Sequence, residues 1–392
     1  MTKKSVELEE SKELEKLAER YNKKIGNVDT IDKFLKKYNP WKGKNFDDLL
    51  DDFFEALKNE DKDFSWLKVN EDLFEDLKDK EEKAVSIDYG IPSHVRGDIE
   101  NGTLFLCLVN PNIEYKGSKN KGIASFYEEA RKLGSDDQSL KILDKNRDIL
   151  KTKKEIKNYI INKEAKSSIL YNEMDSLHDK IKEDKKTPKK YYGYYLSRYF
   201  AQIIISYMHE KTTKHEKTTI QPLMKNLSDV EWNKLEEMSK KIVNLEAFPF
   251  RSRTPNFTAN KEKAKKRFAN CLVNLDSDVS MLSARIIIWR IVKYLKDINK
   301  NSNKGNDITI PKFVFRRFNT VWLPSLINVL YYDLGFTNNY LELIKELHEY
   351  FFLTIDKKSS NRMTGYIGKR LFKNDTMLSD DEFDEFVTET LK

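Results

Sequence analysis

The chain has 392 residues, of which 34% are charged and 39% hydrophobic, and it contains only 13 glycines and 9 prolines. This composition is typical of a helix-rich globular protein with a substantial core, and it excludes a disordered or fibrous chain. Cys107 and Cys271 are the two cysteines, so neither a disulfide framework nor a zinc site built from cysteines is expected. The formal net charge of +7 is modest, so its distribution matters more than its size.

The N-terminal part of the chain is acidic and helical in pattern. It begins with charged residues, and no stretch reaches the roughly 18 consecutive apolar residues that span a bilayer. The sequence therefore predicts a cytoplasmic protein with no membrane partner. Residues 1–85 show apolar positions at helical spacing among acidic residues, which indicates an N-terminal helical segment. Basic residues are instead in excess over residues 141–190.

Four short apolar runs follow, and each reads as a buried strand. They span residues 104–109, 241–248, 312–315 and 350–355. Helical patterns separate them, most clearly at 284–295 and 323–334. This alternation predicts an α/β fold over residues 86–392, a three-layer core with a mainly parallel four-stranded sheet and a helical, basic insertion at about 128–238. Ligands of such sheets bind beyond the carboxyl ends of the strands.

Several catalytic signatures are missing from the sequence. It contains no phosphate-binding Gly-x-x-x-x-Gly-Lys-Ser/Thr loop, no Gly-x-Gly-x-x-Gly, no Gly-x-Ser-x-Gly and no His-Glu-x-x-His. Their absence argues against nucleotide triphosphatases, dinucleotide enzymes, elbow-type serine hydrolases and zinc proteases. The five histidines are scattered, and His209 and His215 in a Lys/Thr-rich stretch favour surface positions over metal ligation.

The first two strand ends carry polar residues suited to a ligand. Asn110, followed by Pro111, ends the first strand, where its amide could hold a water molecule; a plain Asx-Pro turn is the alternative. At the second strand end, Asn244 and Glu246 could read a base edge. The same segment supplies an aromatic face and two guanidinium groups for phosphate, on Phe248, Arg251 and Arg253. A structural turn with incidental charge explains it equally.

Two further segments combine groups that bind phosphate. The loop after the fourth strand contains Lys357, Lys358, Ser359, Ser360, Asn361 and Arg362. Its hydroxyl, amide and cationic groups could contact a nucleic-acid backbone, or it could be a solvated loop. Residues 185–200 interleave basic and aromatic side chains, including Lys189 and Lys190, a pattern typical of nucleic-acid contact. The tyrosines of this stretch also match a helical core stripe.

The order of these segments resembles the uracil-DNA glycosylase superfamily. Gly97 to Asn112 is similar to the first motif of that family, in which an apolar strand runs into Asn-Pro or Asp-Pro. Lys121 to Tyr127 resembles the stretch that supplies an aromatic platform for the flipped base. The strand with Asn244 resembles the one that bears the base-reading amide, and Ser359 to Asn361 lies where the family has its Ser-containing DNA-clamping motif.

The resemblance implies a DNA glycosylase that hydrolyses the N-glycosidic bond of a flipped base, with DNA as partner and without metal or organic cofactor. Asn110 would then position the attacking water, and Phe126 or Tyr127 would stack on the base. The histidine of the family's His-Pro-Ser motif is absent from residues 356–362, which favours a base other than uracil. The chain is similar to anti-phage glycosylases that act on modified cytosines. Two alternatives remain: a non-catalytic sensor of modified DNA and a toxin-like nuclease.

Overall fold

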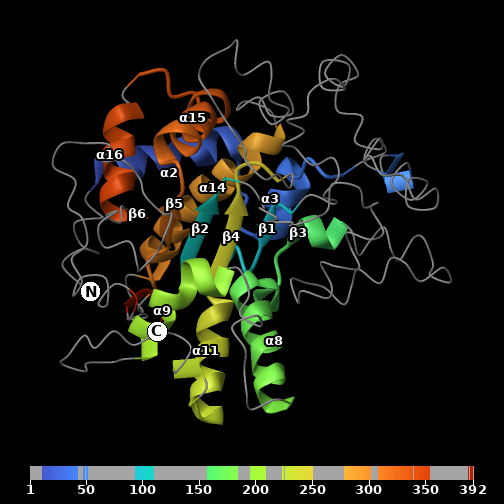
Figure 1. Cartoon of the computed structure of the whole chain (residues 1–392). Helices are drawn as coiled ribbons and strands as arrows, with labels where there is room; N and C mark the ends of the chain where they lie inside the picture. Colours follow the sequence, from blue (N-terminus) through green and yellow to red (C-terminus); the bar gives the residue numbers. More distant parts are fainter. Residues whose placement is uncertain are drawn as a thin grey trace.

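The computed structural model describes part of the chain, and every structural statement below concerns that part. The described residues are 11–42, 47–48, 50–51, 93–109, 157–183, 195–208, 223–224, 226–249, 278–301, 308–338, 340–353, 387 and 389–391. Over these residues a single mixed sheet is covered by helices on both faces (Figure 1). The predicted α/β architecture is therefore present.

The sheet has six strands in the order β3-β1-β4-β2-β5-β6. Their bounds are β1 (Val95–Arg96), β2 (Leu104–Leu108), β3 (Ile161–Asn162), β4 (Ile242–Glu246), β5 (Lys312–Phe315) and β6 (Phe352–Leu353). The four strands β4, β2, β5 and β6 are parallel neighbours, as the four apolar runs predicted. The predicted number of strands was wrong, because β1, antiparallel to β4, and β3 extend the sheet on one side. Each has only two residues, too few to produce a periodic sequence pattern.

The helices that connect β2 to β4 cover one face of the sheet, and those that connect β4 to β5 and β5 to β6 cover the other (Figure 1). Between β2 and β4 lie η3 (Ala165–Ser167), α8 (Ile169–Glu183), η5 (Leu196–Phe200), α9 (Ala201–Met208) and α11 (Asp229–Lys240). On the other face lie α14 (Asp278–Asn301), η6 (Phe318–Thr320), α15 (Trp322–Asn328), η7 (Val329–Asp333) and α16 (Tyr340–Tyr350). The chain moves from β2 to β4 in one direction along the sheet and from β4 to β5 and β6 in the other. The connecting helices change face where this reversal occurs, at β4, as crossovers of one handedness require.

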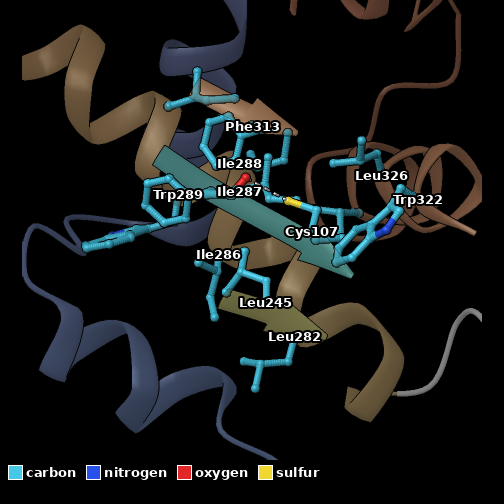
Figure 2. Close-up of a cluster of buried hydrophobic side chains, with 14 of the residues drawn as sticks. Cys107, Leu245, Leu282, Ile286, Ile287, Ile288, Trp289, Phe313, Trp322 and Leu326 are labelled. Carbon is cyan, nitrogen blue, oxygen red and sulfur yellow. Dashed lines mark hydrogen bonds between the residues drawn. The ribbon is translucent and has the colours of Figure 1, made fainter. Parts of the chain in front are cut away.

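Alternating strand residues build a separate core on each face. On β2, Leu104, Leu106 and Leu108 join the core formed by α8, α9 and α11, called the insertion-side core below. Phe105 and Cys107 point to the opposite core, called the α14-side core. Figure 2 shows the apolar residues of α14 packed against β2 and β4 in the α14-side core.

The N-terminal helices α2 (Lys12–Ile25) and α3 (Ile31–Tyr38) belong to the α14-side core. Each begins at a hydroxyl cap, because Ser11 accepts from the backbone NH of Leu14 and Thr30 from that of Lys33. Trp289 of α14 donates its Nε1 proton to the carbonyl of Val28 over 2.8 Å. Within the described residues, no helix has both the length and the apolar character that crossing a membrane requires.

Candidate functional site

The carboxyl ends of β2, β4 and β5 meet at one edge of the sheet. The backbone NH of Phe248 donates to the carbonyl of Val109 over 2.8 Å, and that of Arg316 donates to the carbonyl of Cys107 over 2.9 Å. Val109 and Phe248, close to the last described residues of these two segments, therefore lie side by side. This edge includes the gap between β2 and β5, from which the connections leaving these two strands run in opposite directions along the sheet. Open α/β sheets bind their ligands at such a point.

Two polar side chains of β4 lie buried just below this edge. Asn244 and Glu246 pair with Leu106 and Leu108 of β2, so both point to the insertion side. They are 1% and 3% exposed. Among the described residues, neither side chain has a hydrogen-bond partner for any of its polar atoms. Buried polar groups are normally paired, and each unpaired one costs about 1–3 kcal/mol, so packing alone does not explain this pair.

Burial also sets the charge of Glu246. Desolvation raises the pKa of its carboxyl well above the usual value, and the charge of Arg316 opposes that rise without cancelling it. Burial without a cation or a hydrogen-bond donor on the carboxyl favours its protonated form, which presents one donor and one acceptor. Asn244 likewise offers an NH2 donor and a carbonyl acceptor. The two side chains therefore form an uncharged surface of alternating donors and acceptors.

Positive charge lies at the end of β5, next to Glu246. Arg316 is half-buried, and its Nη1 donates to the hydroxyl of Tyr199 in η5 over 2.9 Å. The next residue, Arg317, is exposed and has φ 57° and ψ 46°, in the left-handed region that non-glycine residues seldom adopt. Two consecutive guanidinium groups at a carboxyl edge can bind an anionic group such as phosphate.

His94 is a third buried polar residue at this edge, but its ring packs against Trp41 of the α14-side core rather than beside Asn244 and Glu246. Its carbonyl accepts from the backbone NH of Glu246, and its Nδ1 accepts from Nε1 of Trp41 over 3.0 Å. Because Nδ1 is an acceptor, the ring proton lies on Nε2, which has no partner among the described residues. Burial lowers the pKa of His94 to about 3, so the ring is neutral. No cluster of three or more metal-ligating side chains occurs in the described part of the chain.

The structure places only part of the predicted site. Asn244 and Glu246 lie together, whereas Phe248 is fully buried in the α14-side core, away from that pair. The other predicted site residues lie outside the described part of the chain: Asn110, Phe126, Tyr127, Lys189, Lys190, Arg251, Arg253, Lys357, Lys358, Ser359, Ser360, Asn361 and Arg362.

Sequence reasoning missed Arg316, Tyr199 and His94 as members of the site. For Arg316 a signal existed, since it directly follows an apolar strand, as Asn110 does. For His94 none existed, because only the antiparallel pairing of β1 with β4 brings it beside Glu246.

The fold and the site together define an α/β protein with a buried, unpartnered polar pair at the carboxyl edge of its parallel strands. Comparison with known proteins adds no relative: no family model, no curated protein and no solved structure matches the chain.

Proposed function

We propose that the protein is a DNA glycosylase that hydrolyses the N-glycosidic bond of a flipped, modified base. The observation that carries this proposal is the pair Asn244 and Glu246, buried at the carboxyl edge without hydrogen-bond partners among the described residues. A nucleobase edge is a flat, neutral row of donors and acceptors. Base-flipping enzymes read it inside a pocket closed to water. A phosphate or carboxylate ligand would fit an uncharged site poorly.

The remaining groups at this edge suit the rest of a nucleotide. Asn110 follows Val109 directly, and Val109 is hydrogen-bonded to Phe248, two residues beyond Glu246. An amide leaving the sheet there could position a water molecule for attack on C1′ of the sugar. The water oxygen bonds to C1′, the bond from C1′ to the base nitrogen breaks, and the base departs with a proton. Arg316 and Arg317 would hold the flanking phosphates.

A modified base as substrate, and a role in defence against phage, rest on the resemblance of the sequence alone. The test is an abasic-site assay with the full chain on single- and double-stranded oligonucleotides that carry unmodified or modified cytosine, uracil or damaged bases. We expect base release from at least one of them. Strand breakage without abasic sites would indicate a nuclease instead, and binding without either product a non-catalytic sensor; either result would overturn the proposal.

Asn110 provides the sharpest variant. If its amide positions the attacking water, Asn110→Ala should slow base release by at least about 100-fold with DNA affinity nearly unchanged, because the lost interaction acts in the transition state. Asn299→Ala, an exposed position on α14, is the matched control and should release base at the wild-type rate. Full activity of Asn110→Ala would show that Asn110 has no catalytic role and that the Asn-Pro pair serves only as a turn that ends the strand.

A further inference from the structure

Resting on the proposed function and extending it, we propose that Glu246 binds its base as an uncharged carboxylic acid, with Asn244 beside it, and so selects a base edge with an adjacent donor and acceptor. The carboxyl hydroxyl would donate to a ring nitrogen or carbonyl of the base, and the carboxyl carbonyl would accept from a neighbouring N–H. The amino edges of cytosine and adenine have this pattern. An ionised carboxylate only accepts, so it would pair instead with two adjacent donors, as on guanine.

The placement of the two side chains supports joint recognition. They lie two residues apart on the same face of β4, about 7 Å apart along the strand, which is comparable to the width of a base. Leu106 and Leu108 lie beside them on β2. The α9 and α11 residues in this core, including Ile203, Ile204, Leu235 and Met238, are apolar. Such walls favour a flat aromatic ligand that satisfies the polar atoms and leaves no water between them.

The surroundings of Glu246 favour the protonated carboxyl, because the side chain is 3% exposed and neither of its oxygens has a donor among the described residues. The charge of Arg316, which directly follows β5, opposes the rise in the carboxyl pKa, but the Arg316 Nη1 group donates to the Tyr199 hydroxyl instead. Both carboxylate oxygens of Glu173 on α8 accept from the backbone NH groups of η5 and the residue before it. On β2, Cys107 is buried with a raised pKa and is therefore an uncharged thiol.

Entry of a base requires the cover over the edge to open. The hydrogen bond between Arg316 and Tyr199 joins η5 to β5 next to Glu246. η5 is a π-helical turn, a conformation frequent at functional sites. Displacement of this turn would break that hydrogen bond and free Arg316 for a phosphate of the same nucleotide.

Glutamine separates the two charge states of residue 246, because its carboxamide has the donor and acceptor of a protonated carboxyl but never ionises. The experiment measures binding of free cytosine, adenine and guanine to the full chain by calorimetry between pH 6 and pH 9. We expect Glu246→Gln to keep wild-type affinity for cytosine or adenine at pH 6. Glu246→Met, of similar volume without hydrogen-bonding groups, should bind about tenfold or more weakly. Glu237→Gln on the exposed face of α11 is the control.

Three results would overturn the inference. The first is a loss of tenfold or more in Glu246→Gln at pH 6, since it would mean that the carboxylate is required. The second is wild-type binding by Glu246→Met, which would remove the side chain from the site. The third is a wild-type affinity for cytosine or adenine that rises with pH. Binding of a free base does not require catalysis. A result that overturns this inference can therefore be distinguished from an absence of base release in the abasic-site assay, which would overturn the proposed function.

Discussion

Unpaired polar atoms concentrate at one place in the described part of the chain. Nine buried side-chain nitrogen or oxygen atoms lack a partner there, and five of them belong to Asn244, Glu246 and His94. These three residues lie on the paired strands β1 and β4 or directly before them. Random imperfections of packing would be spread over the molecule. Destabilising features that are kept because function requires them are found instead at the functional site. The concentration supports the choice of this site independently of any motif, mainly through the four unpaired atoms of Asn244 and Glu246.

The raised pKa of Glu246 predicts a pH dependence of stability. A glutamate in the unfolded chain ionises near its ordinary pKa of 4.5, but the folded carboxyl keeps its proton to a much higher pH. Above pH 4.5 the folded state therefore binds more protons than the unfolded state. Its free energy of unfolding then falls by up to about 1.4 kcal/mol per pH unit until the folded pKa is passed. Glu246→Gln removes this contribution.

The expected measurement is urea unfolding at intervals from pH 5 to pH 8. The stability of Glu246→Gln relative to the wild type should increase steadily with pH. Glu237→Gln, at an exposed and ion-paired position, should follow the wild type. If the wild type and Glu246→Gln differ by the same amount at every pH, the folded carboxyl is already ionised and the neutral site is wrong.

At the scale of elements, the sequence was informative where an element is long enough to carry a pattern. The helix predicted at 284–295 lies inside α14, and the four apolar runs became β2, β4, β5 and β6. The second predicted helix, at 323–334, is less regular, because α15 gives way to the π-helical turn η7 at Val329. The strands β1 and β3 form through partners distant in sequence. The same long-range pairing brings His94 to the site, so no local pattern could predict it.

The turn from β1 to β2 depends on Gly97, which has φ +110°. A Cβ atom there would lie 2.6 Å from the backbone oxygen of Ile242. Gly97→Ala therefore adds a clash with β4 to an unfavourable backbone conformation. Gly26, with φ +88° and nothing within 4 Å of a Cβ atom, has the conformational requirement without the clash.

We expect Gly26→Ala to lower the free energy of unfolding by about 1–3 kcal/mol from backbone strain alone. Gly97→Ala should lower it by at least about 1 kcal/mol more, because the added methyl group overpacks against a central strand. Chemical denaturation of both variants measures the difference. Equal losses would show that β1 can move away from β4 at little cost, and the edge bearing His94 would then not be rigid.

On the scale of the whole molecule, the N-terminal helices are part of the core that supports the site. Leu14, Leu17 and Phe34 are buried in the α14-side core. Arg20 donates to the carbonyl of Gly335, after η7, over 2.7 Å. Trp41 then reaches the candidate site itself, since its indole NH fixes the ring of His94. Residues 11–42 thus connect the far side of α14 with the carboxyl edge of the sheet.

Deletion of residues 1–42 should therefore destroy the fold rather than remove an appendage. It would expose the apolar residues of α14 that α2 and α3 cover, and it would leave His94 Nδ1 without its donor. We expect the truncated chain to be insoluble or to lack a cooperative thermal transition, because burial of large apolar side chains contributes about 1.5–3 kcal/mol each. Adding residues 1–42 as a separate peptide during refolding should restore part of the soluble protein. A truncated chain that melts cooperatively at the wild-type temperature would instead make the N-terminal helices an independent unit.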